Sequence, residues 1–168
     1  MSWDSFFTAE VGATAALTGL LFVGITINLQ RITALPTATI RAFQTLLILI
    51  DAFIIESLFL VPGQSGKVQG IEVLAVGIAL WVVLNAFERS IWHLEPDSFR
   101  ASLWAPTTEI QIPSVFAIVG GVALLIGSPS ALYWFVPMTL ASFLIAIFQA
   151  WVLTVEILKL PNQSAVPR

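Results

Sequence analysis

Long apolar runs separated by short polar connections make up most of the chain. Five such runs cover about residues 6–29, 40–61, 71–91, 112–126 and 132–158. A helix needs about 20 apolar residues to cross a bilayer. Because lipid cannot satisfy backbone hydrogen bonds, a span of this kind must be helical. The pattern predicts an all-α polytopic membrane protein with five transmembrane helices, in a single domain that covers residues 1–168.

The basic residues set the expected orientation. In this five-span topology, six of the seven Lys and Arg residues fall on one side of the membrane, and only Lys67 falls on the other. Short loops rich in Lys and Arg stay cytoplasmic. We therefore expect the N-terminus outside and the C-terminus in the cytoplasm. The run at 112–126 is the weakest span, since it is short and carries Gly120 and Gly121 at its centre.

Composition excludes several classes of function. Hydrophobic residues make up 58% of the chain and charged residues 10%, where a soluble domain has about 25% charged residues. Cysteine is absent, which removes disulfides, thiolate metal sites and cysteine nucleophiles. The net charge of −3 and the lack of a basic cluster argue against nucleic acid as a partner. With His93 as the only histidine, we predict no cofactor and no metal site.

The first apolar run has two distinct faces. At 100° per residue its polar positions share one stripe, and its small residues share the opposite face. The stripe contains Glu10, Thr14, Leu17, Leu21 and Asn28, and the small face includes Gly12, Ala16 and Gly19. Small residues let helices approach closely in lipid.

Two interpretations of this helix follow. It lies at the centre of its own bundle, or it packs on its neighbours through the small face and lines a narrow conduit with the other. In the second case homo-oligomerisation would place rings of Glu10 and Asn28 at the two ends of a pore, and such rings favour cations.

Acidic residues inside the spans are the second signal. Asp51 falls near the middle of the second run, on the same face as Gln44, and a charge at that depth costs at least about 2.5–3.5 kcal/mol. Gln149 of the fifth run falls at a similar depth, which predicts a hydrogen bond between Asp51 and Gln149. The acid is either a structural tie between two helices or a group that takes part in proton or cation passage.

Three further carboxylates are expected near the outer surface. Glu10, Glu56 and Glu72 lie within one or two turns of it and would form an acidic outer mouth. Glu56 is about 140° round the helix from Asp51, so the two face one lumen only if a second helix contributes. The alternative is that these carboxylates reach interfacial water.

Catalysis is not expected, and we predict no catalytic residue. The segment Gly63-Gln64-Ser65-Gly66 resembles the serine motif of rhomboid intramembrane proteases, which also need a histidine base. His93 is predicted on the other side of the membrane, about 30 Å away. The segment is more simply a turn.

The connection from 92 to 111 is the best candidate for binding a partner protein. Its apolar residues Phe99, Leu103 and Trp104 would dip into the headgroup region as part of a short interfacial helix.

The run AALTGLLFV at 15–23, the ending NLQR at 28–31 and the turn VPGQ at 61–64 resemble a group of small bacterial membrane proteins. Some members of that group are labelled "modulator of FtsH protease". The resemblance covers about residues 6–64. It implies a multi-pass protein of the bacterial inner membrane that binds a membrane-anchored AAA protease.

Two functions therefore remain open. One is a homo-oligomeric, channel-like protein that passes cations or protons through the lipid bilayer. The alternative is a non-conducting membrane protein that regulates a membrane-bound protease or another membrane complex.

Overall fold

Helices account for all the regular secondary structure in residues 2–94 and 109–158, which are the residues that the computed structural model describes. Four helices are long and apolar enough to cross a membrane. They are α1 (Trp3–Ile27), α3 (Pro36–Phe59), α4 (Gly66–Leu94) and α7 (Phe135–Leu158). A shorter helix, α6 (Ile112–Leu125), and two connectors, α2 (Leu29–Thr33) and the 3₁₀ turn η1 (Ala131–Trp134), are the other elements of the described residues. The prediction of an all-α chain with membrane-compatible helices is confirmed in this form.

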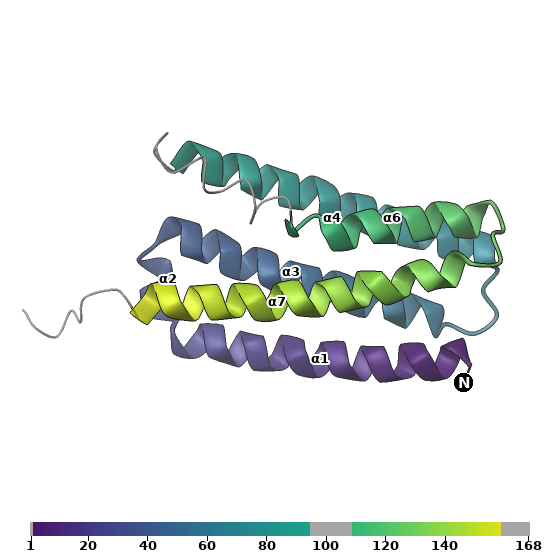
Figure 1. The fold of residues 1–168 in the computed structure, drawn as a ribbon, viewed down its shortest axis with the longest axis horizontal. Helices are drawn as coiled ribbons and strands as arrows, with labels where there is room; N and C mark the ends of the chain where they lie inside the picture. Colours follow the sequence, from purple (N-terminus) through teal and green to yellow (C-terminus); the bar gives the residue numbers. More distant parts are fainter. Residues whose placement is uncertain (1, 95–108, 159–168) are drawn as a thin grey trace, which may run out of the picture.

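The helices form an antiparallel bundle with α3 at its centre. We call the end where α1 begins the N-terminal end and the end where α7 finishes the C-terminal end (Figure 1). α3 packs against α1, α4 and α7, while α6 packs against α4 and α7. Because α1 contacts α3 extensively and α7 only slightly, α1 is a peripheral helix and not the centre of the bundle.

Local sequence explains where the helices start and stop. The side chain of Ser2 accepts a hydrogen bond from the backbone of Ser5 and caps α1, and Pro36 begins α3 in the first turn, where its missing N–H costs nothing. The turns after α3 and α6 use Gly63 and Gly127, whose φ angles are +76° and +72°. A side chain would strain both turns.

α6 differs in length from the other apolar helices. Its 14 residues rise about 21 Å at 1.5 Å per residue, which is less than the roughly 30 Å of a bilayer core. The run predicted at 112–126 is therefore helical, but it does not match the other four in length.

Glycines bring α6 close to α4. A Cβ added to Gly121 would lie 2.7 Å from Leu74 Cγ, and one added to Gly70 would lie 3.0 Å from the backbone oxygen of Gly121. Farther along α4, a Cβ at Gly77 would lie 3.2 Å from Ala117 Cβ. Gly121, Gly70 and Gly77 thus form the surface by which α6 and α4 pack against each other.

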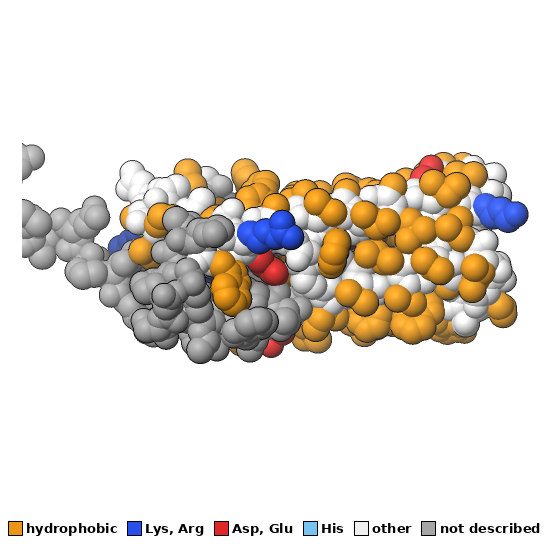
Figure 2. Space-filling model, turned by 90° about the horizontal axis from the view of Figure 1, so that it is seen from above, with side chains coloured by type: hydrophobic (Ala, Val, Ile, Leu, Met, Phe, Trp, Pro, Cys, Tyr) orange, Lys and Arg blue, Asp and Glu red, His pale blue; other side chains and the backbone are white. Residues whose placement is uncertain are grey.

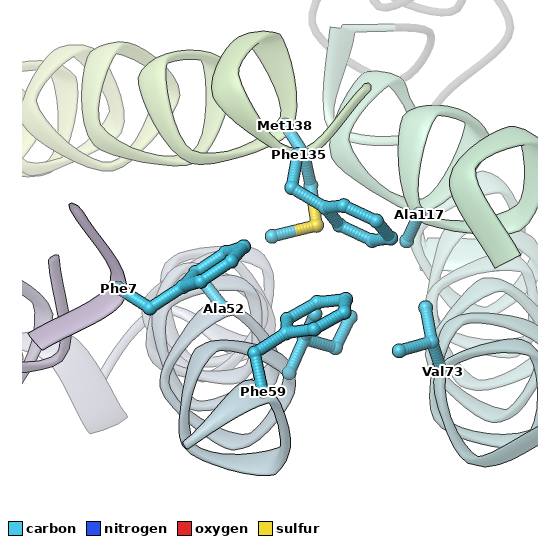
Figure 3. Packing of buried hydrophobic residues seen from close by; sticks show 8 residues of the cluster. Phe7, Ala52, Phe59, Val73, Ala117, Phe135 and Met138 are labelled. Carbon is cyan, nitrogen blue, oxygen red and sulfur yellow. The ribbon is translucent and has the colours of Figure 1, made fainter. Parts of the chain in front are cut away.

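Aromatic rings fill the bundle at the N-terminal end. Phe7 stacks on Phe59 with ring centroids 4.4 Å apart, and Phe59 meets Phe135 at 4.6 Å in an edge contact. Ala52 and Met138 pack around these rings (Figure 3). The cluster joins α1, α3 and α7 across the whole thickness of the bundle.

The small face of α1 has no partner among the described residues. A Cβ added at Gly12 or Gly19 would meet nothing within 4 Å, and Ala16 is exposed. The prediction that Gly12, Ala16 and Gly19 pack α1 on its neighbouring helices is therefore wrong for a single chain. Hydrophobic side chains are spread along the described part of the long surface in Figure 2, which is compatible with a membrane protein.

Candidate functional site

Glu56 is the most completely enclosed charged residue in the described part of the chain, with 0% of its surface exposed. Its carboxyl group lies where α1, α3 and α7 meet. Thr14 Oγ1 of α1 is 2.7 Å from Glu56 Oε2, and Thr139 Oγ1 of α7 is 2.8 Å from Glu56 Oε1. One side chain of the central helix thus binds two of the helices that pack against it, α1 and α7.

Each threonine hydroxyl also lies close to a second acceptor, the backbone carbonyl oxygen four residues earlier in its own helix. Thr14 Oγ1 is also 2.6 Å from the backbone oxygen of Glu10, and Thr139 Oγ1 is 3.0 Å from that of Phe135. A hydroxyl carries one proton and accepts through its lone pairs. It therefore donates either to Glu56 or to the carbonyl one turn earlier, but not to both at full strength.

This arrangement accommodates Glu56 with or without a proton. When Glu56 is ionised, both hydroxyls donate to it. When Glu56 is neutral, its own O–H donates to one threonine, that threonine donates to the carbonyl behind it, and the other threonine still donates to the free carboxyl oxygen. Both states satisfy all the polar atoms at unchanged heavy-atom positions, so a proton can enter or leave without repacking the bundle.

The surroundings of Glu56 differ along the bundle axis. Phe59, one turn toward the N-terminal end, belongs to the aromatic cluster, which closes the middle of the bundle on that side. Glu10 lies one turn from Thr14 on the same face of α1 and is only partly buried. Glu10 is therefore a partly exposed carboxylate on the N-terminal side of Glu56.

Toward the C-terminal end the same three helices border an open groove. Leu17 of α1, Leu49 of α3 and Ala146 of α7 line it, and its volume is about 310 Å³. Leu49 and Ala146 each lie seven residues beyond Glu56 and Thr139, which is about 10 Å along a helix. Glu56 is thus positioned between a carboxylate on one side and an apolar groove on the other.

The structure corrects several expectations about the acidic residues. Glu56 does not belong to an acidic outer mouth, because it is enclosed, whereas Glu72 accepts from Gln64 Nε2 at 3.0 Å near the start of α4. Asp51 is buried, with 5% exposed, as is Gln149, with 3% exposed. No hydrogen bond joins these two residues, and neither side chain bonds to another residue in the described part of the chain.

Helix register explains why the predicted pair does not form. Glu56 contacts Thr139, so these two residues lie at the same level along the axes of α3 and α7. Asp51 is five residues from Glu56, and Gln149 is ten residues from Thr139 in the same direction. The difference of five residues offsets the two side chains by about 7.5 Å along the axis.

The polar stripe of α1 exists but faces its own chain. Thr14 is fully buried against Glu56, and Asn28 lies at the far end of α1, where its Nδ2 donates to the backbone oxygen of Gly24 at 3.0 Å. An oligomeric pore lined by Thr14 is therefore wrong for this packing. Phe99, Leu103 and Trp104 lie outside the described residues.

Sequence reasoning missed Thr139 and the contact between Thr14 and Glu56. Thr139 lies three residues before Ser142 and ten before Gln149, so the three polar residues fall on one side of the fifth apolar run, and this spacing was the available signal. Ser65 of the G-x-S-G segment accepts from the backbone of Val68 at 3.4 Å, which is a helix-capping contact.

Comparisons with family models, curated proteins and solved structures find no match to this chain. The assignment of function therefore depends on the geometry of the chain itself.

Proposed function

We propose that this protein passes protons across a bacterial inner membrane, with Glu56 as the group that carries the proton. The observation that supports this function is the pair of threonine hydroxyls at 2.7 and 2.8 Å, which satisfy the carboxyl group in both of its charge states. Ionisable residues at this depth in a membrane bundle are expensive and commonly functional.

The proposed route runs along α1, α3 and α7 within one chain. A proton enters beside Glu10, is taken up by the Glu56 carboxylate, and leaves into the groove toward the C-terminal end when water enters that groove. One proton is gained and one is lost in each passage, so Glu56 returns to its starting state. Apolar passages of this kind conduct only while they are wetted.

Charge supports an orientation with the N-terminal end outside. Arg31, Arg41 and Arg89 lie in the segments near the C-terminal end, and Lys67 is at the N-terminal end. Basic loops remain in the cytoplasm. Five crossings, with α6 as a short fourth span, would then place the C-terminus inside the cell.

A flux assay with Glu56→Gln tests the proposal. A glutamine side chain can accept from one threonine and donate to the other, so the variant should fold normally while lacking the titratable proton. In proteoliposomes that contain a pH-sensitive dye, we expect an imposed potential to drive proton uptake with the wild type and at least tenfold less uptake with the variant.

The matched control is Glu72→Gln, because Glu72 accepts from Gln64 and an amide oxygen can still do so. This variant should keep wild-type flux. The proposed function would be contradicted if wild-type vesicles took up protons no faster than vesicles without protein. It would also be contradicted if the Glu56→Gln protein kept the full proton flux.

A non-conducting protein that regulates a membrane protease is the second candidate. It is favoured by the aromatic cluster of Phe7, Phe59 and Phe135, which packs the N-terminal end of the bundle and leaves no central opening among them. In this case the contacts of Glu56 serve only to hold three helices together. The resemblance at residues 6–64 suggests a membrane-anchored AAA protease as the partner.

Replacing Phe99, Leu103 and Trp104 together by serine tests this second candidate. We expect the triple variant to lose co-purification with the protease, since those side chains are the apolar surface proposed for docking. The control is Tyr133→Ser in η1, a side chain that is 65% exposed and lies outside the proposed docking surface. If the triple variant retains the protease as well as the control does, this surface is not the docking site.

A further inference from the structure

The groove beside Glu56 is open to the membrane and nearly free of polar groups. It runs between α1 and α7 over the C-terminal half of α3, and Leu21, Leu49 and Ala150 form part of its wall. Leu20 and Ile147 stand at its rim and are 72% and 56% exposed. Because α1 touches α7 only slightly, the space opens sideways between these two helices.

The size and chemistry of the groove select its occupant. Its volume is about 310 Å³. This is roughly the volume that ten water molecules occupy in the liquid, at about 30 Å³ each. That space is far too small for another helix, whose diameter is about 10–12 Å, and it suits a single hydrocarbon chain.

Polar residues occur at one end of the groove only. Asn28 and Thr154 lie there, near the ends of α1 and α7, and Arg31 of α2 follows one turn after Asn28. A phospholipid has the same polarity, with an apolar chain and a charged headgroup. The cationic Arg31 matches an anionic headgroup, because each basic residue beside a membrane surface adds about 1 kcal/mol to the attraction of anionic lipids.

We propose that this groove binds one acyl chain of an anionic phospholipid from the leaflet at the C-terminal end. The chain lies along Leu17, Leu21 and Leu49, and the headgroup lies beside Asn28 and Arg31. In this position the lipid keeps water out of the groove. If protons pass through Glu56 as proposed above, the bound chain closes the route on the C-terminal side, and this consequence alone depends on the proposed function.

Gly24 allows a clean test, because it lines the groove and a Cβ added there would meet nothing within 4 Å. Gly24→Phe should fill the groove without disturbing the helices. Gly19→Phe is the matched control on the same helix, since Gly19 also has open space around it but does not line the groove. The probe is phosphatidylglycerol with a spin label on its acyl chain, in nanodiscs of phosphatidylcholine.

We expect an immobilised component in the electron paramagnetic resonance spectrum of the wild type and of Gly19→Phe, and its loss in Gly24→Phe. Arg31→Gln should reduce the preference for phosphatidylglycerol over labelled phosphatidylcholine by roughly fivefold, which corresponds to about 1 kcal/mol per basic residue near a membrane surface. Equal immobilised fractions in the two phenylalanine variants, or no immobilised component in the wild type, would overturn the proposal.

Glu56→Gln separates this proposal from the proposed function. Its groove residues are unchanged, so it should immobilise the labelled lipid as the wild type does, whether or not the wild type conducts protons. Loss of the lipid signal in Glu56→Gln would show that the groove depends on the carboxylate and would contradict an independent lipid site.

Discussion

Gly121→Ala should destabilise the bundle, whereas Gly19→Ala should leave its stability unchanged or slightly higher. A Cβ at Gly121 would lie 2.7 Å from Leu74 Cγ and 3.2 Å from the backbone nitrogen of Leu74. Overpacking of this kind costs about 1–3 kcal/mol, and the better helix propensity of alanine returns only about 0.5–1 kcal/mol. At Gly19 nothing lies within 4 Å, so only the gain applies.

Unfolding in detergent by increasing denaturant, followed by tryptophan fluorescence, measures these differences. Gly77→Ala gives an intermediate test, because its Cβ would meet Ala117 Cβ at 3.2 Å, a milder overlap than the 2.7 Å contact at Gly121. We expect the loss of stability to rise from Gly19 through Gly77 to Gly121. An equal change at Gly19 and Gly121 would contradict the close packing of α6 on α4.

This pair of helices also shows how far hydropathy can predict a fold. The apolar run at 112–126 predicts a helix, and α6 (Ile112–Leu125) is one. The same pattern cannot distinguish a weak span from a close-packed one, because that difference depends on Gly70 and Gly77 of another helix. Spacing of seven residues places these glycines on one face of α4, but the sequence does not show which helix they meet.

Sequence analysis named two residues of the candidate site, but it did not predict the contacts between them. Thr14 and Glu56 were both expected to be functional, and helical periodicity placed Glu10 and Thr14 on one stripe. Their packing could not be predicted, since Thr14 and Glu56 are 42 positions apart and Thr139 is 83 positions from Glu56. Contacts at that separation depend on which helix is central, and periodicity along one helix does not determine this.

The orientation of α1 about its own axis also differs from the prediction. Small residues favour close packing in lipid, so the small face was expected to contact the neighbouring helices. In the structure the large residue Phe7 and the polar Thr14 make the inward contacts. A hydrogen bond to a buried carboxyl group and an aromatic stack stabilise that orientation, and the small face is left exposed on the surface of the bundle.

Phe135→Ala should cause the largest loss of stability of any single change in the core. The ring is fully buried, contacts Phe59 at 4.6 Å and lies over Gly120, where a Cβ would come within 2.7 Å of Phe135 Cζ. Removing a buried phenylalanine ring costs about 3–5 kcal/mol, because it loses contacts and leaves a cavity. Leu140→Ala is the control on the same helix, since Leu140 is 54% exposed, and it should change stability by less than about 0.5 kcal/mol.

A second replacement at Gly120 tests the contact directly. Gly120→Val alone should be destabilising, because its side chain would collide with the Phe135 ring. In the Phe135→Ala background the same valine enters the space that the ring has left, so the double variant should be more stable than the sum of the two losses predicts, by about 0.5–3 kcal/mol. Additive losses would mean that the ring does not rest on Gly120. The placement of α7 against α6, and with it the position of Thr139 beside Glu56, would then be incorrect.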